Sequence, residues 1–362
     1  MAQSTQSPHC RLQTFAYLIK ANSMSMKTIL ITGGSGYIGS HTVISLLQAG
    51  MSVIVLDNLC NSKKEVVEKI EFITKKSICF IGGDIRDRAT LKAIFKRHPI
   101  DAVIHFAGLK AVGESVAKPL EYFDNNVGGS LILFEEMSLA NVKKLVFSSS
   151  ATVYGDAKTM PISEGFPLQT LNPYGRSKLM VEDILRDLYH SDPQWRIVLL
   201  RYFNPVGAHE SGLIGEDPAG PPNNLMPFVA QVVSGQQKEL LVFGDDYPTK
   251  DGTGVRDYIH VQDLAEGHLA ALQYLECESG LIAVNLGTGR GYSVFEMINA
   301  FEKAASKKVP YKVVARRPGD IAVCYADPTL AKKLFSWEAK LDIDRMCQDA
   351  WRWQQNSANS KP

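Results

Sequence analysis

Long apolar runs, paired cysteines and a charge excess of either sign are all missing from this sequence of 362 residues. No stretch approaches the ~18 continuous apolar residues that a bilayer-spanning helix needs, so we expect no membrane partner. Lysine and arginine number 39 against 38 acidic residues, and the net charge of +1 gives no electrostatic footprint for nucleic acid. The six cysteines are scattered, with no C-x-x-C pair and no histidine cluster beside them. This usage argues against a bound metal and favours a reducing compartment, so we expect a cytoplasmic protein.

The first 26 residues do not share the pattern of the rest. Arg11, the apolar run LQTFAYLI and Lys20 imitate a signal peptide, but Gln13 and Thr14 dilute the run and no A-x-A cleavage site follows. A disordered leader, or a start upstream of Met24 or Met26, is the simpler interpretation. We exclude residues 1–26 from the fold and expect them to be dispensable.

Short apolar runs rich in β-branched residues alternate with segments that can form helices. These predicted strands are residues 27–32, 51–57, 77–85, 101–108, 143–150 and 195–203. Continuous apolar runs of this kind suit strands that are buried on both faces, as in the parallel sheet of a doubly wound α/β fold. The length suggests about two domains.

A Gly- and Pro-rich loop follows residue 203, and loops of this length are usually functional. We place a domain boundary there. The prediction is a doubly wound domain over 27–204, a smaller mixed α/β domain over 205–355, and a tail over 356–362.

Glycines follow the first predicted strand directly. Gly34, Gly36 and Gly39 form G-x-G-x-x-G, and Gly33, Gly36 and Gly39 are spaced three apart, just before a helix pattern. Without Cβ atoms, the turn can tighten and backbone N–H groups can approach a pyrophosphate at the helix N-terminus. The alternative is a tight strand-to-helix turn without a ligand.

Two acidic residues at the ends of neighbouring predicted strands are candidates for contacts to the dinucleotide, and the first of them bears on which dinucleotide binds. Asp57 ends the second predicted strand, 18 residues after Gly39, where a carboxylate accepts hydrogen bonds from ribose hydroxyls and repels a 2′-phosphate. No arginine lies beside it, so NAD is favoured over NADP. Asp84, at the end of the third strand, is either a simple strand cap or a contact to the adenine.

A second group of residues indicates acid–base chemistry. Tyr174 and Lys178 lie four apart on a predicted helix that begins at Pro173, so both face one side. A nearby ammonium favours the phenolate, which makes tyrosine a competent general base. Ser148–Ser150 end the fifth predicted strand, where the ligand crevice of a doubly wound sheet lies. A surface pair of tyrosine and lysine is the alternative.

The motifs TGGSGYIG, HFAGLKAVGES, SSSATVYG, NPYGRSK, RYFNPVGAH, PNNLMP and GTGVRDYIHVQDLA together resemble the extended short-chain dehydrogenase/reductase superfamily. More narrowly, they resemble its UDP-glucose 4-epimerase family, also called UDP-galactose 4-epimerases. The match runs from Lys27 to Trp353. It implies a Rossmann domain that binds NAD, a second domain that binds a UDP-sugar, and a homodimer formed by helices near 118–140 and 174–190.

The resemblance also implies a set of cofactor contacts. These are Gly33, Gly36, Tyr37, Ile38, Gly39, Asp57, Asn58, Leu59, Cys60, Asn61, Ser62, Asp84, Ile85, Phe106, Ala107, Gly108, Leu109, Lys110, Asn125, Ser150, Tyr174, Lys178 and Phe203. For the UDP-sugar it implies Lys110, Ser150, Tyr174, Tyr202, Asn204, Asn224, Leu225, Phe243, Arg256, Arg317, Asp320 and Cys324. Arg256 and Arg317 would pair with the diphosphate, which suits the planar guanidinium fork.

The implied catalytic residues are Tyr174, Lys178 and Ser150. Tyr174 would remove the 4-hydroxyl proton while C4 of the sugar gives hydride to NAD⁺, with Lys178 lowering the pKa of the phenol and Ser150 orienting the proton. The 4-keto sugar would turn about its diphosphate linkage and receive the hydride on its other face. The sequence therefore predicts interconversion of UDP-galactose and UDP-glucose.

Two rival functions share this fold. Nucleotide-sugar 4,6-dehydratases of the superfamily carry Asp-Glu just after the catalytic hydroxyl, where this chain has Ala151 and Thr152. Dinucleotide-sensing proteins without enzymatic activity commonly lack the Tyr/Lys pair, and both residues are present here. The sequence therefore favours the epimerase.

Cys324 departs from part of the family. Some epimerases restricted to plain UDP-hexoses carry a tyrosine at this position, and members with a small residue there have room for a 2-acetamido group. We therefore expect UDP-GlcNAc and UDP-GalNAc to be substrates as well. The alternative is that Cys324 is only a small buried hydrophobic residue.

Overall fold

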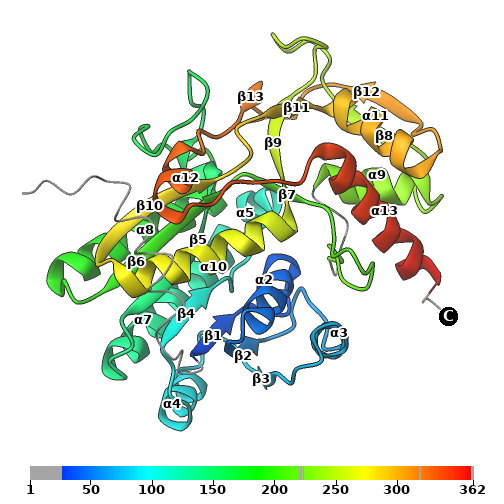
Figure 1. Cartoon of the computed structure of the whole chain (residues 1–362). Helices are drawn as coiled ribbons and strands as arrows, with labels where there is room; N and C mark the ends of the chain where they lie inside the picture. Colours follow the sequence, from blue (N-terminus) through cyan, green and yellow to red (C-terminus); the bar gives the residue numbers. More distant parts are fainter. Residues whose placement is uncertain (1–26, 219, 221, 223, 318, 360–362) are drawn as a thin grey trace, which may run out of the picture.

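A seven-stranded parallel sheet forms the centre of the computed structural model, which describes residues 27–359 except 219, 221, 223 and 318 (Figure 1). The predicted leader, 1–26, thus lies outside the described residues. The strand order is β10-β6-β5-β4-β1-β2-β3. The strands are β1 (Thr28–Thr32), β2 (Ser52–Asp57), β3 (Cys79–Gly82), β4 (Ala102–His105), β5 (Lys144–Ser150), β6 (Arg196–Tyr202) and β10 (Gly280–Leu286).

Six of these strands fall inside the runs predicted from the sequence, and the predicted parallel α/β fold is confirmed. The seventh strand, β10, was not predicted, and it lies within the range assigned to the second domain. It pairs in parallel with β6, from Gly280 beside Arg196 to Leu286 beside Tyr202. The sheet therefore draws on residues on both sides of the predicted boundary at 204, and the division into two domains stays a prediction.

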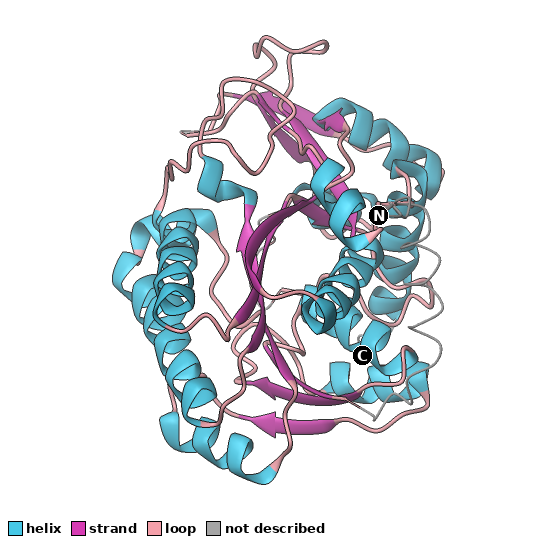
Figure 2. Ribbon diagram, turned by 60° about the vertical axis from the view of Figure 1, so that its left-hand side comes forward, coloured by secondary structure: helices cyan, strands magenta, loops and turns pink. Residues whose placement is uncertain are grey.

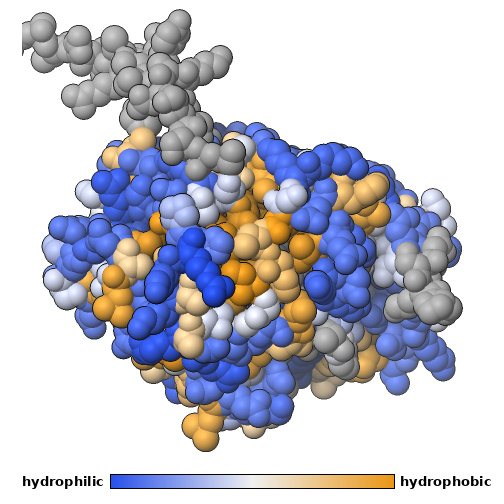
Figure 3. Space-filling model, turned by 90° about the horizontal axis from the view of Figure 1, so that it is seen from below, coloured by the Kyte–Doolittle hydropathy of each residue, from blue (hydrophilic) through white to orange (hydrophobic). Residues whose placement is uncertain are grey.

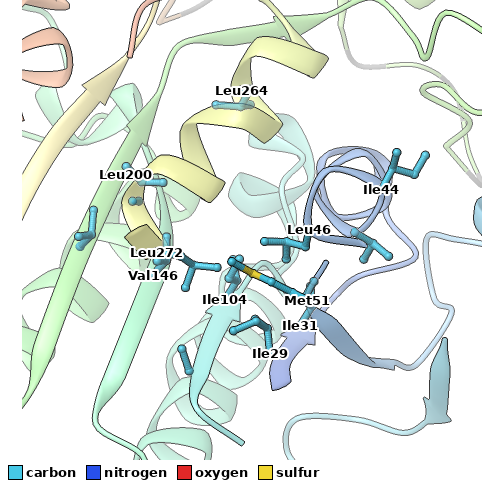
Figure 4. Packing of buried hydrophobic residues seen from close by; sticks show 14 of the residues in the cluster. Ile29, Ile31, Ile44, Leu46, Met51, Ile104, Val146, Leu200, Leu264 and Leu272 are labelled. Atoms are coloured by element: carbon cyan, nitrogen blue, oxygen red, sulfur yellow. The ribbon is translucent and has the colours of Figure 1, made fainter. Parts of the chain in front are cut away.

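Helices cover both faces of the sheet, as Figure 2 shows. On one face lie α2 (Tyr37–Gln48), α3 (Glu65–Thr74), α10 (Val261–Cys277) and α12 (Thr329–Phe335); on the other lie α4 (Arg88–Arg97), α7 (Gly129–Leu139) and α8 (Pro173–Ser191). Alternation along the strands fills both cores: Ile29 and Ile31 pack on the first face (Figure 4), whereas Leu30 packs on the second. This alternation explains why the strands read as continuous apolar runs.

The C-terminal part adds a smaller unit with its own core. Its helices α9 (Leu225–Val233), α11 (Val294–Ala305) and α13 (Ile343–Asn359) pack together. β7 (Asn204–Val206), β9 (Val255–His260), β11 (Gly291–Ser293) and β13 (Val323–Cys324) form one sheet, and β8 (Leu240–Phe243) and β12 (Tyr311–Val314) form another. Ser293 and Glu296 start α11 with a reciprocal capping box, which satisfies two backbone N–H groups.

Apolar side chains are exposed on a group of short segments beside α8. The exposed residues lie in α5 (Val112–Ala117), α6 (Pro119–Tyr122) and α7, and the π-helix η1 (Phe123–Gly128) joins α6 to α7. Leu120 and Leu139 are 81% and 79% exposed.

The face in Figure 3 is mainly hydrophilic, with hydrophobic residues gathered near its middle. Among the described helices, none combines the length and apolarity needed to cross a bilayer.

The order of the strands reverses direction at β1, which lies between β2 and β4. In an open parallel sheet, the loops at the carboxyl ends of two such strands separate and leave a crevice for a ligand. Gly33 follows β1 and Phe106 follows β4, so this crevice lies where the glycine motif is.

Candidate active site

The glycine turn is shaped by close contacts at two of its glycines. Gly33 has φ +73, and a Cβ there would lie 2.7 Å from the backbone nitrogen of Ala107. A Cβ at Gly39 would lie 2.3 Å from the carbonyl oxygen of Gly33. Both positions therefore exclude any side chain in the folded chain.

Gly36 is different, because a Cβ there would meet only the carbonyl oxygen of Gly33, at 3.3 Å. Gly36 is the N-cap of α2, has φ −71, and makes no side-chain capping hydrogen bond. The first turn of α2 contains no acidic residue. The helix N-terminus is thus open toward the crevice and suited to a pyrophosphate.

This difference gives a prediction. Gly36→Ala should fold, because its backbone conformation suits alanine, but should purify with less NAD, since the methyl group fills space that the pyrophosphate needs. A steric penalty of about 1–3 kcal/mol corresponds to a roughly 5- to 150-fold loss of affinity. The measurements are NAD released by denaturation and the melting temperature.

Gly39→Ala is the matched comparison, and it should instead lose stability. A Gly36→Ala protein with a full complement of NAD would contradict this account of the glycine turn.

Asp57 ends β2 beside this turn. Its Oδ2 accepts a hydrogen bond from the Ser35 backbone N–H at 2.9 Å, and its Oδ1 accepts from the Leu59 N–H at 2.9 Å and from Ser62 Oγ at 3.0 Å. Asp57 is 8% exposed and lines the crevice, where its carboxylate fits a ribose diol.

Asp84 does not line the crevice. Its carboxylate binds the Arg86 side chain and accepts from Asn58 Nδ2 at 2.9 Å. The hydrogen bonds from Arg86 hold the pKa of Asp84 well below its usual range. These bonds hold the turn after β3, while both the strand cap and the contact to adenine stay predictions.

Most of the residues that the resemblance implied for the cofactor lie around one cleft. Those that line it are Gly33, Gly36, Tyr37, Ile38, Gly39, Asp57, Asn58, Cys60, Asn61, Ser62, Ile85, Phe106, Ala107, Gly108, Leu109, Lys110, Asn125, Tyr174 and Lys178. Leu59, Asp84, Ser150 and Phe203 are outside this lining. Leu59 has φ +60 and belongs to the turn after β2, and Phe203 packs in a buried apolar cluster.

Tyr174 and Lys178 meet the end of β5 inside this cleft. α8 begins at Pro173, as predicted, and the side chain of Asn172 caps it by accepting from the Gly175 N–H at 2.9 Å. Lys178 Nζ donates to the Ser148 carbonyl at 2.7 Å. Ser150 is 8% exposed and accepts from Thr152 N and Oγ1 at 3.2 and 3.0 Å.

Burial dominates the electrostatics of this pair. It raises the pKa of the Tyr174 phenol, and a hydrogen bond with Ser150 opposes that shift. Burial also lowers the pKa of Lys178 to about 8. The Tyr174 base therefore needs help from positive charge to ionise near neutral pH.

One organising residue, Asn126, was missed by the sequence analysis, which named its neighbour Asn125. Asn126 Oδ1 accepts from the Leu109 N–H at 2.8 Å, and Asn126 Nδ2 donates to the Leu109 carbonyl and to Ser177 Oγ, both at 3.0 Å. It thus holds the loop after β4 against α8. It lies in the π-helix η1, a conformation that often occurs at functional sites.

A second feature missed by the sequence analysis is residues 213–218, which border the cleft. Glu216 forms an ion pair with Lys110 at 2.9 Å, and Asp217 forms one with Lys63 at 2.5 Å. The partners are 106 and 154 residues apart, so no local pattern could have revealed them.

A second pocket contains the residues that the resemblance implied for the diphosphate and uridine. Asn224, Leu225, Phe243, Arg256, Arg317 and Asp320 line it, together with Phe228, Tyr247 and Tyr258. The Arg317 guanidinium lies 3.8 Å from the centre of the Phe243 ring. Asn224 Nδ2 donates to Glu216 at 2.8 Å, so the two pockets adjoin. Among the described residues, no group of three acidic, cysteine or histidine side chains could hold a metal ion.

The remaining implied sugar contacts lie near these pockets. Tyr202 lines the cofactor cleft, and its hydroxyl contacts His268. Asn204 starts β7 and pairs with Tyr258 of β9. Cys324 is buried with Phe203 in an apolar cluster and pairs in β13 with Arg256 of β9.

Comparisons with known proteins agree with this geometry. The family model described as GDP-mannose 4,6 dehydratase matches residues 30–350. The chain is 59% identical to the UDP-glucose 4-epimerase of Bacillus subtilis, over 91% of this chain and 98% of that protein. It is 56% identical to the UDP-glucose 4-epimerase of Mus musculus, over 92% and 98%. The structure of the Bifidobacterium longum UDP-glucose 4-epimerase with NAD⁺ and UDP superposes with a TM-score of 0.90, at 56% identity and 92% and 100% coverage.

Proposed function

The chain belongs to the UDP-glucose 4-epimerase family of the extended short-chain dehydrogenase/reductases, and from this membership we propose that it interconverts UDP-galactose and UDP-glucose in galactose metabolism. The observation that carries the proposal is that Tyr174 and Lys178 line the cleft suited to NAD, beside Ser150 at the carboxyl end of β5. The open N-terminus of α2 and the carboxylate of Asp57 would hold the pyrophosphate and the adenosine ribose.

The residues of the chain supply proton transfer and orientation. NAD, when bound, takes up the hydride from C4 of the sugar and returns it. Tyr174 accepts the proton of the 4-hydroxyl, Ser150 orients that hydroxyl, and the ammonium of Lys178 stabilises the phenolate. Because C4 becomes planar in the 4-keto sugar, its original configuration is erased. When the turned 4-keto sugar is reduced on its other face, Tyr174 returns the proton to the 4-oxygen.

The 4-keto sugar must turn within the site while its nucleotide stays fixed. Arg256 and Arg317 would hold the diphosphate, and Phe243 would cover the uracil. Asp320, which pairs with Arg256 at 3.5 Å, would bind the uridine ribose. Anchoring the diphosphate leaves the bonds between it and the sugar free to rotate.

A dehydratase is not favoured, although the matching family model carries that description. Such an enzyme needs a further acid and base to eliminate water. The residues after Ser150 are Ala151 and Thr152, and the Thr152 hydroxyl donates to Ser150 Oγ at 3.0 Å. Thr152 therefore supports the Ser150 hydroxyl. Neither Ala151 nor Thr152 has a carboxyl group that could serve as the acid or base of an elimination.

We also propose that the protein forms a homodimer and works in the cytoplasm. The exposed side chains of Leu120 in α6 and Leu139 in α7 support a homodimer formed along α6, α7 and α8. The described cysteines are all free thiols, which supports a reducing cytoplasm.

An assay of the purified protein tests the function. With UDP-galactose as substrate, we expect UDP-glucose to form without net release of NADH, because the cofactor is restored in each cycle. Accumulation of a dehydrated product, or stoichiometric release of NADH, would contradict the proposal.

A further inference from the structure

A buried ion pair lies behind the catalytic end of β5, and neither of its residues lines the cofactor cleft. The side chains of Glu182 in α8 and Arg201 in β6 are 0% and 2% exposed. Arg201 donates from Nη2 to Glu182 Oε2 at 2.7 Å and from Nε to Oε1 at 3.0 Å. Desolvation makes such a pair weak evidence for stability, so a functional role is worth seeking.

Glu182 also binds the strand that carries Ser150. Side chains alternate along a strand, and Ser149 therefore points away from the face that Ser148 and Ser150 share. Ser149 Oγ donates to Glu182 Oε1 at 2.6 Å, in a fully buried contact. This hydroxyl has no part in the proton transfer described above.

Three residues one helical turn apart thus join α8 to three consecutive residues of β5. The Tyr174 hydroxyl lies near that of Ser150, Lys178 bonds with the carbonyl of Ser148, and Glu182 bonds with Ser149. The helix can neither slide nor rotate against the strand without breaking at least one of these contacts.

The network continues beyond Arg201 toward the sugar site. Arg201 Nη1 donates to Tyr154 Oη at 2.9 Å, and that hydroxyl donates to Asn285 Oδ1 at 2.7 Å. Asn285 Nδ2 donates to the Ile162 carbonyl at 2.9 Å, and the Ile162 N–H donates to the Tyr325 carbonyl at 2.9 Å. The anchored helix is therefore linked to the segment that contains β13.

We propose that Glu182 and Ser149 are positioning residues for the epimerase reaction, fixing α8 on β5 so that Tyr174 meets Ser150 in reactive geometry. The inference rests on the proposed function. A general base acts only within hydrogen-bond reach of its proton, and a misplacement of about 1 Å can cost on the order of 100-fold in rate. Loss of the anchor should therefore reduce turnover, whereas the cofactor and nucleotide contacts lie elsewhere.

Two variants test the anchor in different ways. Ser149→Ala removes the contact to the strand and leaves the pair of Glu182 and Arg201 intact. Glu182→Gln keeps an acceptor for Ser149 but removes the charge that Arg201 needs. Asp183→Asn is the control, because the Asp183 carboxylate is 63% exposed and bonds with Arg186, whose separate bond to Glu182 Oε2 at 2.7 Å the substitution leaves in place.

We expect Ser149→Ala to lower kcat by about tenfold or more, with KM for UDP-galactose, bound NAD and melting temperature close to wild type. The acidic limb of its pH profile should move to higher pH, because the contact with Ser150 that lowers the pKa of Tyr174 is weakened. Asp183→Asn should match the wild type in every respect.

A folded Ser149→Ala protein with wild-type kcat and pH profile would overturn the inference. So would a loss of kcat that merely follows the fraction of folded or NAD-loaded protein. If Glu182→Gln fails to fold, Ser149→Ala decides alone. The wild type is assayed in parallel, so that failure of the proposed function and failure of the positioning role can be told apart. An inactive wild type contradicts the proposed function. Variants as active as an active wild type contradict the positioning role.

Discussion

Tyr174→Phe should lose turnover by roughly 10²–10⁴-fold, the usual contribution of a positioned general base, while it keeps its NAD. The phenylalanine ring preserves the packing of the start of α8 and removes only the hydroxyl that we propose takes the 4-hydroxyl proton. The hydroxyl of Ser150, which is hydrogen-bonded by Thr152, cannot replace it, because a serine hydroxyl is far less acidic than a phenol. The measurements are kcat with UDP-galactose and NAD released on denaturation.

The pH dependence gives this prediction a second readout. Burial raises the pKa of Tyr174, so the activity of the wild type should rise with pH as the phenol ionises. The pKa of Lys178 is lowered to about 8, so its side chain is mostly ammonium at neutral pH and favours the phenolate. Removing that charge in Lys178→Met should raise the pKa of Tyr174 and move the acidic limb to higher pH. The variant should then lose more activity at neutral than at alkaline pH.

Tyr122→Phe is a suitable control for the loss of a buried phenol. The Tyr122 hydroxyl donates to the carbonyl of Ala111 at 2.8 Å and lies outside the cofactor cleft. This variant should lose stability rather than turnover per folded molecule. Near-normal turnover in Tyr174→Phe, with full NAD content, would remove Tyr174 from the reaction.

Local patterns in the sequence are enough to predict the parallel sheet and the cofactor turn. Six strands follow from apolar, β-branched runs, because burial on both faces leaves that mark in the sequence itself. The start of α8 at Pro173 follows from the conformational fit of proline to a first helical position. The roles expected of Asp57, Tyr174 and Lys178 follow from the chemistry of a carboxylate, a phenol and an ammonium group. Their spacing in the sequence places these groups near the glycine turn and on one side of a helix.

Long-range pairing could not be predicted in the same way. Strand β10 is an ordinary apolar run, and its partner β6 is far away in the sequence, with Gly280 beside Arg196. The contacts of Glu216 with Lys110 and of Glu182 with Arg201 join residues that are distant or unremarkable in the sequence. Asn126 lies in a π-helix, which changes the direction in which the following side chains point. A periodic pattern of apolar residues does not reveal such a change, so the role of Asn126 could not be predicted.

Cys324 raises the question of how far the substrate range extends. It is 8% exposed and packs with Tyr154, Phe203 and Ala326, and burial raises the pKa of its thiol to about 11. These facts suit a small hydrophobic residue. Its strand partner, however, is Arg256, which lines the nucleotide pocket. The side chain thus lies at the boundary between the core and the substrate site.

Cys324→Tyr should therefore strongly reduce turnover of UDP-GlcNAc and UDP-GalNAc while it spares UDP-glucose and UDP-galactose. A phenol ring cannot stay within the cluster without overpacking, which costs typically about 1–3 kcal/mol, so it should extend into the space that a 2-acetamido group needs. Discrimination of roughly 10- to 200-fold is what one such steric change gives. The measurement is kcat/KM for all four UDP-sugars, with the melting temperature as a check on packing.

Cys324→Ala is the matched control, since it keeps the space open and should retain both activities. Equal loss of all four activities in a folded Cys324→Tyr protein would mean that the ring disturbs the catalytic site as a whole. Absence of N-acetyl turnover in the wild type would show that another wall limits the sugar. Selective loss, in contrast, would place the boundary of substrate size at this one strand position, because the ring adds bulk without altering Tyr174, Lys178 or Ser150.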